Sequence, residues 1–208
     1  ISLNNSITQN TLVAIGLFII SIIILFNNFR LVRKRDKEWE KQLGIANFKV
    51  NTDPLTGVKS KNAYIDRETE LNNKISEKEI TEFAICVCDI NDLKYVNDHS
   101  GHKAGDEYIR NSCRTICDIF QHSPVFRVGG DEFVVILEGR DYENRSELLS
   151  SIYKRVKENK LQNKAVVAVG MSEFRPGEDR HVSSVFNRAD ELMYENKLQL
   201  KGNSADIR

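Results

Sequence analysis

The chain has 208 residues, enough for one ordinary domain and an attached segment, and it is 40% hydrophobic and 29% charged. This composition is typical of a globular protein and excludes a long disordered chain. The formal net charge is zero, which gives no indication of nucleic-acid binding, so nucleic acid is not expected as a partner.

The first 29 residues carry no charged side chain, and residues 11–26 read TLVAIGLFIISIIILF. Because a bilayer core of about 30 Å needs roughly 20 helical residues, we predict a transmembrane helix over residues 11–29. A buried core helix and a signal peptide are the alternatives. A signal peptide carries its basic residues before the apolar run, whereas here they follow it, at Arg30, Arg33, Lys34, Arg35 and Lys37.

The positive-inside rule places these basic residues in the cytoplasm. We therefore expect a single pass through the cell (inner) membrane, with the remainder of the chain cytoplasmic. The chain begins with Ile rather than Met, and we expect residues 1–10 to be the extracytoplasmic stub of a longer N-terminal region, which would act as a sensor.

Residues 30–49 are highly charged and contain no helix breaker apart from Gly44. They predict a juxtamembrane helix or linker. Val32, Trp39 and Ala46 lie seven residues apart, which is a weak heptad pattern and too short to establish a coiled coil. A solvated connector and a dimerising signalling helix both remain open.

The rest of the chain predicts alternating helices and strands. In chain order we expect a loop at 51–57, a helix at 60–78, a strand at 82–90, a short polar helix or turn, a helix at 103–120, strands at 125–128 and 132–137, a helix around 148–156, a strand at 164–171 and a helix at 182–200. The core order β-α-β-β-α-β predicts an α+β, ferredoxin-like fold, with an antiparallel sheet covered by helices on one face.

The sequence FRVGGDEFVVIL at residues 126–137 predicts a hairpin. A Gly-Gly pair between apolar runs is typical of type I′ and II′ turns, which need φ > 0. We therefore expect Gly129 and Gly130 to form the tight turn, where the lack of side chains would also let a ligand approach the backbone.

Four cysteines are present, at Cys86, Cys88, Cys113 and Cys117. Their CxC and CxxxC spacings do not match the usual zinc signatures, and disulfides are not expected in a cytoplasmic domain. We expect buried, small apolar side chains, with the first pair alternating across a strand and the second pair on one helical face.

Acidic and amide side chains gather after the strand that ends at Asp89. Within a few residues come Asn91, Asp92, Lys94, Asn97, Asp98, His102 and Asp106. In the predicted fold, Asp89 lies beside the hairpin that carries Asp131 and Glu132. Such oxygen ligands suit Mg²⁺, and no His/Cys cluster favours a softer metal. The alternative for isolated acids is a role in turns and helix caps, which suits Asp98.

This arrangement is consistent with phosphoryl or nucleotidyl transfer, in which metal ions neutralise charge on phosphate oxygens. Backbone amides of a tight turn after Asp89 would cradle phosphates, and Lys94 would add positive charge. The sequence contains no Walker, GxSxG or kinase motif.

Five blocks of the sequence, in order and at matching spacing, resemble the GGDEF family of diguanylate cyclases. These are DPLTG (53–57), DINDLKYVND (89–98), GHKAGD (101–106), GGDEF (129–133) and ADELMYENK (189–197). The resemblance covers residues 50–203 and implies that residues 50–208 form the catalytic domain. It implies condensation of two GTP into cyclic di-GMP and two pyrophosphates, by a homodimer that holds one GTP in each subunit.

The resemblance also implies roles for individual residues. Asp89, the Ile90 carbonyl and Asp131 would bind Mg²⁺, with two ions per site and Mn²⁺ as a substitute, and Asp131 would be the catalytic base with Glu132 in support. The implied substrate contacts are Asn97, Asp106 and His102 for guanine, and Lys94, Lys197, Lys201 and the amides of Asp92 and Leu93 for the triphosphate. An ionised Asp106 accepts from guanine but cannot donate to adenine.

Three positions depart from the family pattern. Asn91 replaces the second acid of a DxD, and Lys201 replaces an Arg, which keeps charge but loses the bidentate fork. The RxxD of the family's product-inhibition site is absent from residues 120–123, so we expect no feedback inhibition there. The alternative function is a catalytically silent GTP-binding signalling adaptor, although the acids that such modules lose are intact here.

Overall fold

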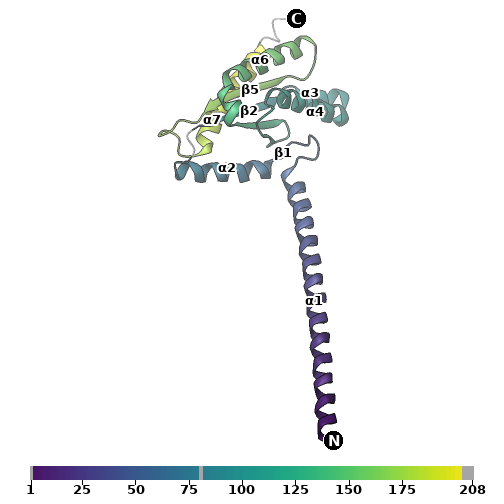
Figure 1. Cartoon of the computed structure of the whole chain (residues 1–208). Coiled ribbons are helices and arrows are strands. Elements are labelled where there is room, and N and C mark those ends of the chain that lie inside the picture. Colours follow the sequence, from purple (N-terminus) through teal and green to yellow (C-terminus); the bar gives the residue numbers. More distant parts are fainter. Residues whose placement is uncertain (1, 80–81, 203–208) are drawn as a thin grey trace. The chain divides into compact units, whose positions relative to one another are not determined.

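The computed structural model describes residues 2–79 and 82–202 (Figure 1). The chain divides into two compact units, Ile1–Phe48 and Lys49–Arg208. In the helix that begins the chain, the side chains of residues 2–19, 23, 43 and 45–47 lie outside the description.

The N-terminal helix, α1 (Ser2–Asn51), runs without interruption through the predicted transmembrane segment and the predicted connector. Gly44 does not break it. Among the residues described with their side chains, no helix is both long enough and apolar enough to cross a membrane. Part of the segment predicted to do so, at residues 11–19, and the predicted stub at 1–10 fall outside those residues.

The second unit is an α+β domain, as predicted. Its elements are β1 (Lys59–Ser60), α2 (Lys61–Ser76), β2 (Ala84–Ile90), α3 (Leu93–Ser100), α4 (His102–Ile119), β3 (Val125–Arg127), β4 (Glu132–Leu137), α5 (Gly139–Glu143), α6 (Arg145–Leu161), β5 (Val167–Glu173) and α7 (Val182–Gly202). The sheet order is β1-β3-β4-β2-β5. Strands β3, β4, β2 and β5 are antiparallel neighbours, whereas β1 pairs in parallel with β3 and makes the sheet mixed.

Helices cover both faces of this sheet, so the prediction of a single covered face was wrong. One core cluster packs β2, β4 and β5 against α4 and α6, and the other packs the opposite faces of these strands against α2 and α7. The reason lies in β2, whose sequence AICVCDI is buried at every position. A strand whose side chains are apolar on both faces must be covered on both sides.

The hairpin β3–β4 is confirmed, but its turn differs from the predicted type. Neither Gly129 nor Gly130 has a positive φ, and the turn is closed by the Val128 and Gly129 amides, which donate to the Glu132 carbonyl at 3.0 and 3.3 Å. This connection is longer than a two-residue turn, so it does not need the left-handed region. The Glu132 side chain packs against Gly129, where a Cβ would lie 2.6 Å from Glu132 Oε2.

All four cysteines are free, and three of them are buried, as expected. The prediction that Cys86 and Cys88 alternate across the strand was wrong. Both lie in the same core cluster, with their Sγ atoms 3.8 Å apart, because residues two apart on a strand share a face. Cys113 and Cys117 lie on one face of α4, with Sγ atoms 4.0 Å apart.

A bidentate ion pair fixes the segment between β5 and α7. Arg188 Nη1 and Nη2 donate to the two oxygens of Asp179 at 2.6 and 2.8 Å, and the Asp179 side chain is only 3% exposed. The hydrogen bonds from Arg188 hold the pKa of Asp179 below its ordinary value of 3.8.

We predict that Arg188→Met lowers the free energy of unfolding by about 3 kcal/mol at pH 7, because it leaves a buried carboxylate without its partner. A lowered pKa contributes stability above the unfolded value of 3.8 and loses it as pH falls through the folded value. The difference between wild type and variant should therefore shrink below about pH 4. Urea unfolding across this range measures it, with the exposed neighbour Arg180→Met as control.

Candidate functional site

The site begins at the C-terminal end of β2, an interior strand of the sheet, where Asp89 is 6% exposed. Ladder pairing places Asp89 opposite Glu132 on β4 and opposite Ala168 on β5. Because the strand is paired on both sides, the carboxylate stands at a fixed position at the edge of the core.

A single ammonium group faces this carboxylate. Lys197 Nζ, from α7, lies 2.6 Å from Asp89 Oδ1. Burial raises the pKa of the Asp89 carboxyl; the Lys197 ammonium opposes this effect and the charge of Asp131 adds to it, so the pKa lies above its ordinary value. The charge of Lys201 acts in the same direction as that of Lys197, so both lysines favour the ionised form of Asp89.

The hairpin turn brings the second acid to the same place. The Ile90 amide donates to the Asp131 carbonyl at 2.9 Å, which ties the end of β2 to the turn. Asp131 is half-buried, and Glu132, the first residue of β4, is exposed. The predicted meeting of Asp89 with the hairpin acids is thus what the fold produces.

The donor set at this edge fits a hard divalent cation. Two carboxylates from β2 and the turn converge, and the adjacent Asn91 is 3% exposed, with a buried Oδ1 that has no hydrogen-bond partner among the described residues. Across those residues no group of three or more His, Cys, Asp or Glu side chains could hold a metal. Mg²⁺ is commonly held by only one or two carboxylates, with water and substrate phosphates completing its shell.

A second group of predicted residues lies on α3 and α4, directly after the metal candidates. Asp92 adopts φ 60°, a left-handed conformation that Asp tolerates better than most residues, and its carbonyl accepts from the Val96 amide at 3.0 Å. This turn starts α3 at Leu93, which packs against the core, and leaves Lys94 exposed.

The helices α3 and α4 are packed closely at one point. A Cβ on Gly105 would lie 1.9 Å from Asn97 Oδ1, so the Asn97 side chain lies directly against the backbone that precedes Asp106. The structure therefore places Asn97 against Gly105, the residue before Asp106. His102, the first residue of α4, is exposed.

One connection at the site was not predicted from the sequence. Arg127 Nη1 donates to Asp53 Oδ1 at 3.1 Å, and its Nη2 donates to the Gly130 carbonyl at 2.7 Å. Asp53 also accepts from the Thr56 amide and hydroxyl at 2.9 and 2.6 Å. The loop at 51–57 is thereby joined to the hairpin turn. An arginine inside an otherwise apolar strand was the available signal.

The same contacts set the charge of Asp53. Burial alone would raise the pKa of Asp53, but the hydrogen bonds from Thr56 and Arg127 outweigh it and hold the pKa below its ordinary value. Asp53 is therefore ionised at neutral pH and paired with Arg127, so its role is to hold the turn rather than to exchange protons.

Comparison with known proteins gives a consistent result. The family model described as diguanylate cyclase, GGDEF domain, matches residues 50–203. A diguanylate cyclase of Vibrio cholerae is 30% identical over 113 residues, which is 52% of this chain and 35% of that protein. An uncharacterized membrane protein of Staphylococcus aureus is 27% identical over 154 residues, which is 71% of this chain and 43% of that protein. The chain thus spans less than half the length of these relatives.

Among solved structures, the coiled coil and GGDEF domain of DgcB from Caulobacter crescentus, in complex with c-di-GMP, superposes with a TM-score of 0.69. It is 23% identical, and the match covers 84% of this chain and 95% of that one. At this identity the likeness shows the fold.

Proposed function

Because the chain belongs to the GGDEF-domain family of diguanylate cyclases, we propose that it condenses two GTP into cyclic di-GMP and two pyrophosphates. The observation that supports this most directly is the meeting of Asp89 and Asp131 at the end of β2, where the Ile90 amide joins the strand to the turn. Both acids that the proposed chemistry requires are present, and both lie at the same end of the sheet.

In the proposed reaction, the 3′-hydroxyl of one GTP attacks the α-phosphorus of the other, and the bond to the β-phosphate breaks to release pyrophosphate. Asp131 accepts the hydroxyl proton, with Glu132 beside it in support. Mg²⁺, or Mn²⁺ in its place, would be held by Asp89, Asp131 and the Ile90 carbonyl, with two ions per site, and would neutralise charge on the phosphate oxygens. Side chains of the domain would orient and recognise the nucleotide.

We assign guanine recognition to α3 and α4. An ionised Asp106 accepts from the N1–H and amino group of guanine, and the Asn97 amide both donates and accepts. His102 would line the same pocket. The triphosphate would be bound by Lys94, Lys197, Lys201 and the amides of Asp92 and Leu93. When the cation enters, Lys197 would leave Asp89 and bind a phosphate.

Each subunit supplies one GTP in this scheme, so the active form is a homodimer. We further propose that the chain is anchored in the cell membrane with its catalytic domain in the cytoplasm, under the control of a sensor that precedes residue 1. The uncharged residues 1–29 support the anchor, as does the exposure of the described apolar side chains at Ile20, Ile22, Ile24, Leu25, Phe26 and Phe29.

A catalytically silent module that binds GTP and signals as an adaptor is the second candidate. Incubation of the full chain with GTP and Mg²⁺ separates the two, with cyclic di-GMP and pyrophosphate measured together. We expect one cyclic dinucleotide for every two pyrophosphates. GTP binding without any product, even under forced dimerisation, would support the adaptor, and no GTP binding would rule out both.

The absence of the RxxD motif leads to a separate prediction. At the corresponding positions Phe120 is 1% exposed, and the His122 amide is bound to the buried Asp141 at 3.0 Å, so neither a guanidinium nor a free carboxylate is presented. We expect micromolar cyclic di-GMP to leave the initial rate of the full chain unchanged. A non-reacting GTP analogue, which should inhibit, is the control, and inhibition by product that GTP does not relieve would contradict the prediction.

A further inference from the structure

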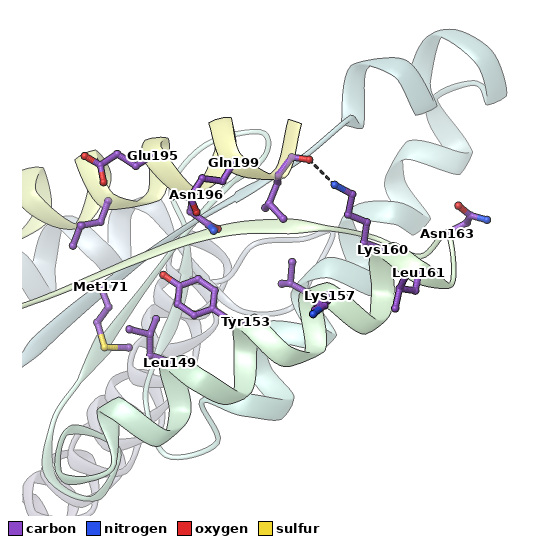
Figure 2. A pocket seen from close by; sticks show the side chains of 13 residues that line it. Leu149, Tyr153, Lys157, Lys160, Leu161, Asn163, Met171, Glu195, Asn196 and Gln199 are labelled. Atoms are coloured by element: carbon purple, nitrogen blue, oxygen red, sulfur yellow. Dashed lines mark hydrogen bonds between the residues drawn. The ribbon is translucent and has the colours of Figure 1, made fainter. Parts of the chain in front are cut away.

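The last strand of the sheet, β5, has one edge without a partner strand among the described residues. Along it, α6, β5 and α7 enclose a groove of about 1100 Å³ (Figure 2). Tyr153 from α6 and Asn196 from α7 point towards one another across this groove.

These two side chains bind both backbone groups of one edge residue, Val169. The Val169 amide donates to Asn196 Oδ1 at 3.0 Å, and the Tyr153 hydroxyl donates to the Val169 carbonyl at 3.2 Å. An unpaired edge residue would normally bind water or another strand. Here α7 is tied to the sheet at a defined position along its length.

The hydrogen bond between Asn196 and Val169 lies next to the candidate site on both β5 and α7. Val169 pairs with Cys88, next to the pairing of Ala168 with Asp89, and Asn196 directly precedes Lys197, whose ammonium lies 2.6 Å from Asp89. Successive helical residues are about 100° apart. The same turn of α7 therefore reaches the free edge of β5 with Asn196 and the Asp89 carboxylate of the neighbouring strand β2 with Lys197.

Helix α7 is in backbone contact with β5 and cannot approach the strand more closely. A Cβ on Gly170 would lie 2.1 Å from the Met193 amide nitrogen and 2.2 Å from the Ala189 carbonyl oxygen. Van der Waals contact with backbone fixes the distance between α7 and β5. The rotation and sliding of α7 are also restricted by hydrogen bonds: Arg188 donates to Ser172 Oγ and to the Glu173 carbonyl at the end of β5, and Asn196 makes the bond to β5 that lies next to Lys197.

We propose that Asn196 is a positioning residue: its bond to the Val169 amide fixes the turn of α7 that carries Lys197 and thereby holds Lys197 on Asp89. Tyr153 assists by holding the other backbone group of Val169. The link to nucleotide binding rests on the proposed function, in which Lys197 contacts the triphosphate; the link to Asp89 does not. The competing explanation is that Asn196 only blocks the sheet edge against self-association.

The first experiment needs no nucleotide. Urea unfolding of the full chain with Asp89→Asn, Lys197→Ala and the double variant gives the coupling between the two side chains. Repeating the cycle with Asn196→Ala added should give a clearly smaller coupling. Gln199→Ala is the matched control, because Gln199 lines the same groove from the same helix, and it should leave the coupling unchanged.

The second experiment measures binding of a fluorescent GTP analogue with Mg²⁺. Asn196→Ala should weaken it about three- to tenfold, the effect of one lost hydrogen bond, with a rise in KM and little change in kcat. In a Lys197→Ala background, Asn196→Ala should have no further effect. An unchanged coupling, or additive losses in affinity, would overturn the proposal and leave edge protection as the role of Asn196. Absence of GTP binding by the wild type would count against the proposed function alone.

Discussion

Replacement of Asp131 by Asn is expected to lower turnover by about 10³-fold or more while GTP still binds, because the amide keeps the shape of the side chain but can neither accept the 3′-hydroxyl proton nor balance a divalent cation. The Asp131 main chain accepts from Ile90, and this bond survives the substitution. The turn should therefore remain in place.

The measurement compares cyclic di-GMP formation with binding of a fluorescent GTP analogue. Asp66→Asn is the matched control, since Asp66 is an exposed acid on α2, and its turnover should equal that of the wild type. Retained turnover in Asp131→Asn would reject the role given to this carboxylate. Loss of both turnover and GTP binding would indicate that Asp131 acts mainly in binding.

Replacement of Gly170 by Ala is expected to have the largest effect on stability. The new Cβ would stand 2.1 and 2.2 Å from backbone atoms of α7, and backbone cannot move aside as a flexible side chain can. Overpacking of a core commonly costs about 1–3 kcal/mol, and we expect the loss here to be about 3 kcal/mol or more in the free energy of unfolding. Urea or thermal unfolding of the full chain measures it.

Gly130→Ala is the control for the loss of glycine itself. Within the described residues no heavy atom lies within 4 Å of a Cβ added at Gly130, and the residue has no positive φ. The free energy of unfolding of Gly130→Ala should therefore differ from that of the wild type by less than about 1 kcal/mol. A Gly170→Ala variant as stable as this control would mean that α7 can move away from β5 without loss.

The strands of the core and their order could be predicted because each is a short apolar run bounded by turn residues. The run AICVCDI at β2 predicted a strand, and the hairpin around Gly129 predicted an antiparallel pair. The two-residue strand β1 could not be predicted, since Lys59 and Ser60 carry no periodic pattern. Their pairing with Phe126 and Arg127 depends on where the preceding loop is held.

Two of the three wrong expectations, the turn type and the single covered face, have physical causes in the way the strands pair and pack. The turn type at Gly129 was inferred from the residue pair alone, but the turn is set by bonds to the Glu132 carbonyl, which only the strand register determines. The second covered face of the sheet was overlooked, although the side chains of β2 are apolar on both of its faces. That pattern is a signal that could have been used.

The candidate site was predictable in part. The convergence of Asp89 with Asp131 follows from strand order, and the structure brings Asn97 to the backbone beside Asp106. The roles of these residues remain predictions. An arginine in the apolar strand β3 indicates that it has a partner, but the identity of that partner could not be predicted, because Arg127 and Asp53 are 74 positions apart.

The interior position of β2 in the sheet has a consequence for how fast the site can rearrange. This strand is paired on both sides and buried throughout, so its amides should open to hydrogen exchange only in global unfolding. The turn that carries Asp131 is held by bonds to the carbonyls of Glu132, Asp131 and Gly130, but it lies at the surface and should open at a lower free energy than β2. One acid is therefore held more rigidly than the other, and cation binding should slow exchange at residues 129–131 more than at Asp89.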